Sequence, residues 1–155
     1  MNHALNAAVQ SAAEELFGSV VGVSASFQPP VEMREDRKSQ HETTVVISFV
    51  GTISGAFALR CSTRAASRIA TQMLGTPVAE GSDDMKDAVG EFFNMLVGTA
   101  KTKYATAGEP FRISVPTTVI GESYVLHIKA NDADALTLIE MGFEAERLSI
   151  EIYLK

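Results

Sequence analysis

The sequence predicts an α/β (α+β) protein in which helices pack on a largely antiparallel sheet. Its strand-like segments follow one another in pairs rather than alternating singly with helices, which favours hairpins and antiparallel pairing. Other segments have the 3.6-residue apolar period of amphipathic helices. A chain of 155 residues fits one domain, 1–155, and can bury a core without disulfide or metal staples.

The N-terminal part predicts a helix and then a strand. Apolar residues recur near a 3.6 period over residues 3–17, and Gly18 is a suitable residue to follow the helix end. Residues 20–27 predict a strand. Residues 28–41 carry two prolines and mixed charges, so they predict a solvated loop or hairpin tip, with a partner surface as the alternative.

The middle of the chain predicts a hairpin and two helices. Residues 43–50 and 55–61 are its strands. A helix then runs to Leu74, where glycine and proline end it. A longer helix over about 83–106 begins at a Ser or Asp cap.

The remainder of the chain is rich in predicted strands. The last of them alternates apolar and polar residues, so one face should be buried and the other wet. The residues expected on the wet face are Ser149, Glu151 and Tyr153. The expected strands are 111–119, 122–130, 135–143 and 147–154.

Composition narrows the classes of function. The formal net charge of −6 disfavours nucleic acid, which needs a basic footprint, and favours protein or small-molecule partners. Cys61 is the single cysteine, so we expect a core residue in a reduced, cytoplasmic protein rather than a disulfide or zinc ligand. With neither a signal-peptide pattern nor a membrane-length apolar run, we expect no membrane association.

Other catalytic patterns are weak. His3, His41 and His127 are far apart in the sequence and form no triad pattern with Ser or Asp. The segment 51–55 has two glycines but is too short for a phosphate loop and leads into a strand. We therefore expect no cofactor and no metal ion bound by this chain itself.

The helix over 83–104 carries the most informative residues. On a wheel of about 100° per residue, its apolar and polar residues fall on opposite sides. The side expected to be buried contains Met85, Val89, Phe92, Phe93, Leu96 and Ala100. The side expected to be exposed contains Asp83, Asp87, Gly90, Glu91, Asn94, Gly98 and Lys101.

Glu91 and Asn94 are three residues apart, so their side chains stand next to each other on the exposed side. Any surface helix has a polar face, and this is the simplest explanation. However, Asn is a poor residue in the middle of a helix, and Gly90 and Gly98 each cost roughly 1 kcal/mol relative to Ala. A surface that another protein must approach closely explains these choices better than helix stability does.

The run from Asp87 to Gly98, DAVGEFFNMLVG, resembles the signature of the CheC, CheX and FliY family of chemotaxis phosphatases. That signature has Asp or Ser, three residues, Glu, two residues and Asn, then a proline some twenty residues later. Asp87, Glu91 and Asn94 match its first three elements. Pro116 resembles the fourth, about one residue closer than usual.

Further segments, 17–22, 51–59 and 66–75, also resemble this family. CheC and FliY-like members usually carry the Glu–Asn pair twice. Here Glu14 and Glu15 of the first helix have no Asn three positions on, so the single copy resembles the CheX type.

The resemblance implies a CheC-like fold and a protein aspartyl-phosphate phosphatase acting on a phosphorylated CheY-like response regulator. Asn94 would position the attacking water, because a neutral amide both donates and accepts hydrogen bonds without repelling the phosphoryl group. Glu91 would pair with a lysine of the regulator and fix its docking.

The remaining residues of the exposed side, Asp87, Gly90, Gly98 and Lys101, would form the docking surface. The resemblance also implies a homodimer, and a Mg²⁺ ion that belongs to the partner regulator. The alternative function is a non-catalytic scaffold or binding module for a response regulator or signalling partner.

Overall fold

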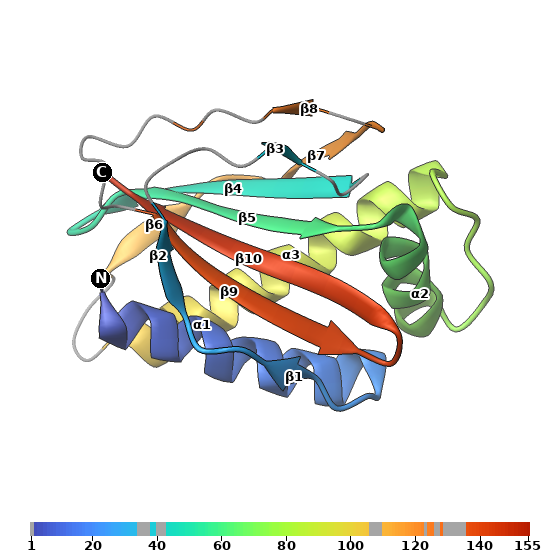
Figure 1. Cartoon of the computed structure of the whole chain (residues 1–155), viewed down its shortest axis with the longest axis horizontal. Coiled ribbons are helices and arrows are strands. Elements are labelled where there is room, and N and C mark those ends of the chain that lie inside the picture. Colours follow the sequence, from blue (N-terminus) through green and yellow to red (C-terminus); the bar gives the residue numbers. More distant parts are fainter. Residues whose placement is uncertain are drawn as a thin grey trace.

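Helices lie together on one face of an antiparallel sheet in the computed structural model of the chain (Figure 1). The structure describes residues 2–33, 38–39, 43–105, 110–122, 124–125, 128 and 136–155. The helices are α1 (His3–Leu16), α2 (Thr63–Leu74) and α3 (Asp83–Tyr104). The fold class predicted from the sequence is confirmed.

The main sheet has the strand order β1–β9–β10–β5–β4–β6; in addition, β2 pairs with β9 and β7 with β4. All of these strand pairs are antiparallel. A separate pair consists of β3 (Lys38–Ser39) and β8 (Tyr124–Val125). The strands of the main sheet are β1 (Ser26–Phe27), β2 (Val31–Met33), β4 (Thr43–Gly51), β5 (Gly55–Cys61), β6 (Phe111–Ile113), β7 (Thr117–Ile120), β9 (Leu136–Phe143) and β10 (Glu146–Leu154).

Strand alternation gives the sheet two different faces. Phe57 and Leu59 of β5, with Ile150 of the neighbouring β10, face the helices and are fully buried. Each such side chain contributes about 1.5–3 kcal/mol when it is buried. The apolar sides of the three helices close over this face and form the main core.

The second face, away from the helices, is also buried over β5 and β10. Ala58, Tyr153 and Leu136 form a smaller apolar cluster there. The expectation that Ser149, Glu151 and Tyr153 lie on a wet face is wrong, because they are only 3%, 0% and 2% exposed. Alternation along one strand separates two faces, but it does not say what covers each of them.

The end of α1 differs from the sequence prediction. The helix continues from Leu16 into a π-helical turn over Phe17–Val21, which ends at Gly22 with φ of 76°. Gly18 is therefore not the terminating residue, and only Ser26–Phe27 of the expected strand 20–27 is extended. A left-handed φ is easy only for glycine, which is why the turn stops at Gly22.

Two predicted strands have different limits in the structure. The strand expected at 111–119 is divided into β6 and β7, with Pro116 between them. Proline has no N–H to donate to a ladder, so it interrupts the pairing with β4. Of the strand expected at 122–130, the described residues contain β8, while His127 lies outside them.

The expected loop over 28–41 contains two short strands in its described part. β2 pairs with β9, and β3 pairs with β8. The charged residues 34–37 and His41 lie outside the described residues.

Candidate functional site

The two sides of α3 are largely those predicted. The helix begins at Ser82, whose hydroxyl accepts a hydrogen bond from the Met85 N–H at 3.2 Å. Acidic residues occupy the first turn and lysines the last, which complements the helix dipole. All six residues of the expected buried side are buried: Met85, Val89, Phe92, Phe93, Leu96 and Ala100.

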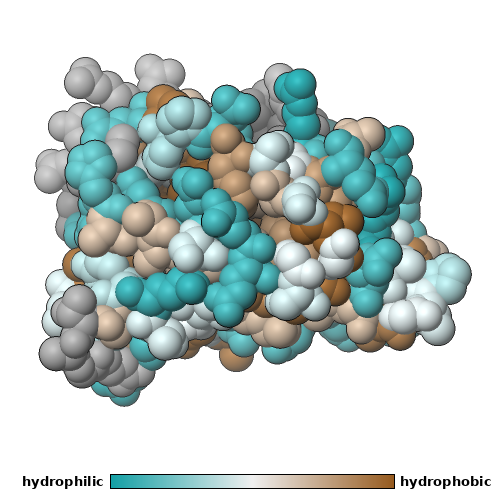
Figure 2. All heavy atoms as spheres, turned by 90° about the horizontal axis from the view of Figure 1, so that it is seen from below, coloured by the Kyte–Doolittle hydropathy of each residue, from teal (hydrophilic) through white to brown (hydrophobic). Residues whose placement is uncertain are grey.

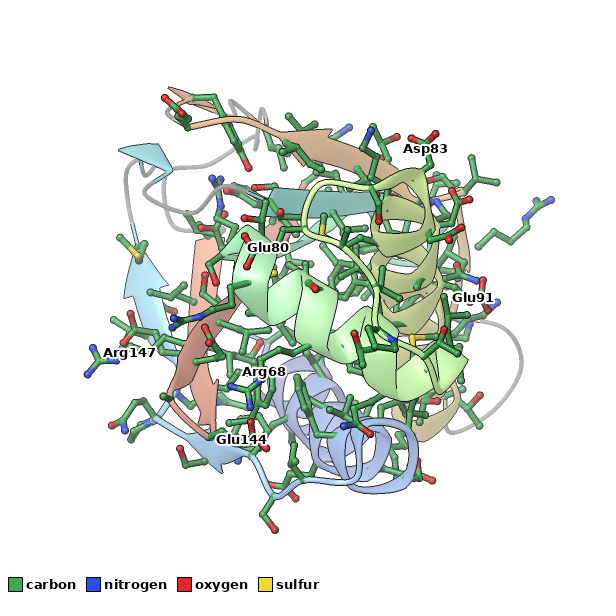
Figure 3. The ribbon with its side chains drawn as sticks, turned by 90° about the vertical axis from the view of Figure 1, so that its right-hand side faces the viewer. Arg68, Glu80, Asp83, Glu91, Glu144 and Arg147 are labelled. Atoms are coloured by element: carbon green, nitrogen blue, oxygen red, sulfur yellow. The ribbon has the colours of Figure 1, made fainter. Side chains whose placement is uncertain are left out.

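The opposite side of α3 forms a polar stripe, by which we mean Asp87, Glu91, Asn94, Gly98 and Lys101. Asp87 and Glu91 are exposed, and the other three are partly exposed. Figure 3 shows Glu91 on the outer side of α3, away from the strands of the sheet. The sequence predicts these residues on one side of the helix, and in the structure they lie on one surface.

Glu91 and Asn94 do not take part in holding the fold together. Among the contacts of the described residues, neither side chain has a hydrogen bond or an ion pair. Their polar atoms therefore remain available to another molecule. By contrast, Lys86 pairs with Asp83 at 3.2 Å, and Lys103 pairs with Glu15 of α1 at 3.2 Å.

The expectation that Gly90 lies on the exposed side is wrong, because Gly90 is buried. A Cβ built on it would lie 3.6 Å from Cγ of Pro116 and 3.5 Å from Oγ1 of Thr118. The segment around Pro116 therefore covers this position. The wheel could not show this, because it describes α3 alone and not the strand that packs beside it.

This contact gives the predicted proline element a structural role. Pro116 ends the segment between β6 and β7 and packs across α3 at Gly90. Gly98 is different, since a Cβ built there would meet no atom within 4 Å. Of the two glycines, Gly98 is the one that leaves the stripe open to close approach.

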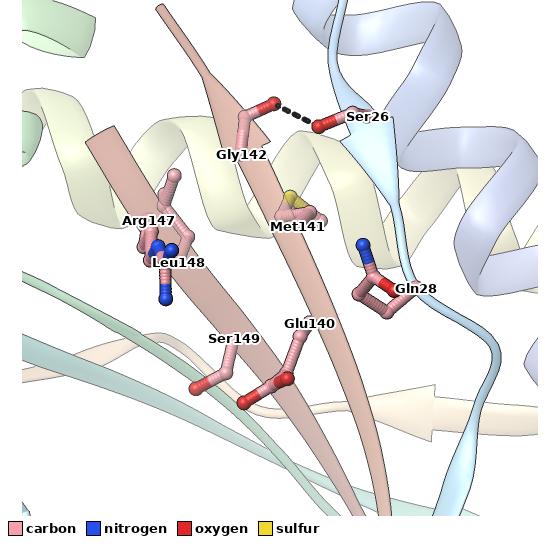
Figure 4. Close-up of a pocket in the computed structure, with 8 residues that line it drawn as sticks. All are labelled: Ser26, Gln28, Glu140, Met141, Gly142, Arg147, Leu148 and Ser149. Carbon is pink, nitrogen blue, oxygen red and sulfur yellow. Dashed lines mark hydrogen bonds between the residues drawn. The ribbon is translucent and has the colours of Figure 1, made fainter. Parts of the chain in front are cut away.

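Two concave parts of the described surface lie away from this stripe. A pocket of about 540 Å³ is lined by residues of β9 and β10 and of the β1 segment, among them Gln28, Glu140 and Arg147 (Figure 4). A smaller one of about 130 Å³ lies near Arg68 and Glu144, which form an ion pair. Neither pocket contains a residue of α3, and Figure 3 places Arg147 and Glu91 on opposite sides of the molecule.

The polar stripe is thus a helix surface rather than a pocket for a small molecule. Figure 2 shows the face that lies below in the view of Figure 1, on which hydrophobic side chains are interspersed with hydrophilic ones. Ligand sites for small molecules are concave and mostly apolar. A surface helix on which Glu91 and Asn94 have no side-chain partner among the described residues suits a macromolecular partner better.

The sequence did not predict a buried charged group on the second face of the sheet. Arg60 and Glu151 form an ion pair at 2.9 Å, and Tyr153 donates a hydrogen bond to Glu151. Burial lowers the pKa of Arg60, but the charge of Glu151 and the interactions with Tyr153 and Glu151 together outweigh it, so that the pKa is raised. Burial, and then the charge of Glu151, raise the pKa of Tyr153. The available signal was weak: Arg60 and Glu151 are opposite charges on two adjacent strands, at positions that alternate with those facing the helices.

Cys61 is a core residue, as expected. It is 1% exposed, and burial raises the pKa of its thiol to about 12. A thiol that stays protonated at neutral pH is a poor nucleophile. The described residues contain no cluster of His, Cys, Asp and Glu suited to a metal ion. Nor does any helix among them have the length and apolar character to cross a membrane.

Several solved structures with similar folds are those of chemotaxis proteins. Chemotaxis protein CheX of Desulfovibrio desulfuricans has a TM-score of 0.86 at 18% identity, covering 97% of this chain and 99% of that one. A CheC-like protein of Shewanella has a TM-score of 0.84 at 21% identity, covering 100% and 99%. At these identities the similarity shows the fold, and it confirms the CheC-like architecture.

A third similar structure is a chain of the CheX–CheY–BeF₃–Mg²⁺ complex of Borrelia burgdorferi. Its TM-score is 0.73 at 14% identity, covering 97% of each chain. No curated protein sequence matched the chain. The family described as chemotaxis phosphatase CheX matches residues 43–139, which is more than half of the chain and includes the whole of α3. The chain therefore belongs to the chemotaxis phosphatase CheX family.

Proposed function

We propose that this protein is a phosphatase that removes phosphate from the aspartyl phosphate of a CheY-like response regulator. The observation that carries the proposal is the Glu91–Asn94 pair on the polar stripe of α3, which has no side-chain partner in the part of the chain that the structure describes. The helix beneath the pair is anchored by Phe92, Phe93 and Leu96, each 0% exposed. Two polar groups on a rigid support are what a docking and positioning site requires.

The chemistry needs little from the protein. A water oxygen attacks the phosphorus, the bond between phosphorus and the aspartyl oxygen breaks, and the aspartate leaves as a carboxylate. The water oxygen becomes part of the inorganic phosphate, which keeps one of the two water protons, and the other proton passes to the solvent. Asn94 would hold this water in line with the breaking bond, accepting a hydrogen bond from it through the amide oxygen.

Glu91 has a different role in this proposal. Its carboxylate would repel the phosphoryl group if it stood beside the attacking water. It would instead accept a charge-assisted hydrogen bond from a lysine of the regulator, which fixes the register of docking. Asp87, Gly98 and Lys101 extend the contact along the helix. Gly90 is covered by Pro116 and acts through that contact rather than by touching the partner.

The Borrelia burgdorferi complex supports this choice of partner, because in it a CheX protein is bound to CheY with BeF₃ and Mg²⁺. We infer the same kind of partner here, with the Mg²⁺ bound by the regulator. A scaffold that binds the regulator without catalysis is the alternative, and the experiment below separates the two.

The test is steady-state dephosphorylation at several regulator concentrations, with binding to a BeF₃⁻-activated regulator measured by titration. Asn94→Ala should lower kcat by about 10²-fold with little change in affinity. Glu91→Ala should weaken binding by roughly 1.5–3 kcal/mol and also lower the rate. Full turnover in Asn94→Ala would contradict the mechanism. Binding by the wild type without any dephosphorylation would favour the scaffold.

We also propose that the protein forms a homodimer, since symmetric dimers are the commonest assembly and the family resemblance implies one. Light scattering at micromolar concentration should give twice the chain mass of 16.6 kDa. A single species of 16.6 kDa would reject the dimer without affecting the catalytic proposal.

A further inference from the structure

Val115 is the most exposed of the large apolar residues described on the surface. Its side chain is 82% exposed, compared with 64% for Val50 and 55% for Val31. A single exposed valine is ordinary and needs no explanation by itself. Its position and its rigidity are what distinguish Val115.

The backbone around Val115 is fixed by hydrogen bonds to β4. The Ser114 N–H donates to the carbonyl oxygen of Ser48 at 2.8 Å, and the Ser48 N–H donates to Oγ of Ser114 at 3.0 Å. The same hydroxyl donates to the carbonyl oxygen of Val115 at 3.1 Å. The following proline further restricts the backbone of Val115 to extended conformations. An exposed side chain on such a support loses little entropy when a partner binds it.

The position of Val115 is next to the polar stripe. Pro116, the next residue, packs across Gly90 of α3. Asn94 lies one helical turn after Gly90, on the same side of the helix. In Figure 1, α3 runs from the end of the sheet where β7 finishes towards the end where β6 lies. Because α3 and the β6–β7 segment run in opposite directions past the Gly90–Pro116 contact, the residues before Pro116 lead towards the turn of α3 that carries Asn94.

From this arrangement we propose that Val115 is a docking residue, packing against an apolar patch beside the phosphorylated aspartate of the response regulator. The inference rests on the proposed function and adds the contact that selects a folded protein over a small acyl phosphate. Protein interfaces commonly combine polar groups with an apolar anchor that loses its water on binding. The stripe supplies the polar groups, and Val115 supplies the anchor beside Asn94.

The experiment compares Val115→Ser with Val31→Ser, which removes a valine that is 55% exposed on β2, a strand that pairs with β9 at the other end of the strand order from β4 and β6. Binding to the BeF₃⁻-activated regulator and steady-state dephosphorylation are measured for both, together with the urea midpoint. Val115→Ser should raise Kd and KM by about tenfold, because burial of a valine side chain is lost from the complex. Its kcat and urea midpoint should stay at the wild-type values, and Val31→Ser should match the wild type throughout.

Unchanged Kd and KM in Val115→Ser would overturn the inference, as would equal weakening in both valine variants. The inference and the proposed function fail in different ways. If the wild type binds the regulator but does not dephosphorylate it, the catalytic proposal fails and the Kd comparison still decides the role of Val115. If the wild type neither binds nor dephosphorylates the regulator, both are wrong.

Discussion

The helices α1 and α3 pack against each other on the same face of the sheet. They differ in the residue that stands three positions after an exposed glutamate. Both carry exposed glutamates, Glu14 on α1 and Glu91 on α3. Three residues after Glu91 stands Asn94, which is partly exposed and has no side-chain partner within the described ranges. Three residues after Glu14 stands Phe17, which is 0% exposed.

Phe17 shows why α1 has no room for the polar pair. Its ring meets that of Phe92 at 5.1 Å in an edge-to-face arrangement, and that of Phe143 at 5.3 Å. Phe17 also begins the π-helical turn that carries the chain from α1 towards the sheet. A helix can present a Glu–Asn pair only on a turn that the core does not need, and α3 has such a turn while the end of α1 does not.

The largest effect on stability should come from replacing Phe17, the buried residue at the end of α1. Phe17→Ala should lower the free energy of unfolding by about 3–5 kcal/mol, because a buried ring is lost and a cavity remains. Urea denaturation measures this, with the exposed Glu14→Ala as the matched control at within about 0.5 kcal/mol of wild type. A loss near 1 kcal/mol in Phe17→Ala would show that this turn is not part of the core.

The next largest effect, on the rate of dephosphorylation, should come from a leucine placed on α3 but not from one placed after α1. A Cβ at Gly98 of α3 or at Gly18 after α1 would meet no atom within 4 Å, so Gly98→Leu and Gly18→Leu should both fold normally. Gly98→Leu should reduce dephosphorylation by about tenfold or more, because the added side chain keeps the regulator from the stripe at a cost of at least about 1.4 kcal/mol. Gly18→Leu should leave the rate unchanged. Equal rates in the two variants would mean that the partner does not pack on α3.

The accuracy of the sequence prediction also differs between these two helices. The sides of α3 followed from its apolar period, since amphipathicity records which residues face the core. The π-helical turn after α1 has no comparable signal, because Gly18 and Gly22 were both suitable terminators by residue type. Only the packing of Phe17 into the core distinguishes them.

The errors at Gly90 and at β10 have a common cause. Gly90 is covered by Pro116, and the polar residues of β10 are covered on the second face of the sheet. A periodic pattern reports the geometry of one element by itself. It does not report which distant segment packs on that element, so exposure was predicted wrongly in both places.

A smaller effect on stability should distinguish Gly90, which Pro116 covers, from Gly98, which is open. Gly90→Ala should raise the free energy of unfolding by up to about 1 kcal/mol, because Ala is the better helix former. Its Cβ would meet Thr118 and Pro116 at 3.5 and 3.6 Å, which is ordinary contact. Thermal unfolding measures the gain. Gly90→Leu should instead destabilise the protein, since the larger side chain must displace Pro116, and a stable Gly90→Leu variant would contradict the observed packing.

The smallest effect on stability should belong to the residue with the largest role in the chemistry. Asn94→Ala should change the free energy of unfolding by no more than about 0.7 kcal/mol, and in the stabilising direction, because Ala replaces a poorer helix former. No buried contact is lost, since the Asn94 side chain is partly exposed and has no partner among the described residues.

Urea denaturation of Asn94→Ala should be run on the same preparation that is used for the kinetics. If Asn94 were needed only by the fold, the variant would lose stability and activity together. If Asn94 is kept for catalysis, the variant should lose activity alone, because the replacement is neutral or favourable for the stability of the helix. If Asn94→Ala lost several kcal/mol of stability, Asn94 would resemble Phe17 in its role. The contrast between α1 and α3 would then concern only how two helices pack on the same sheet.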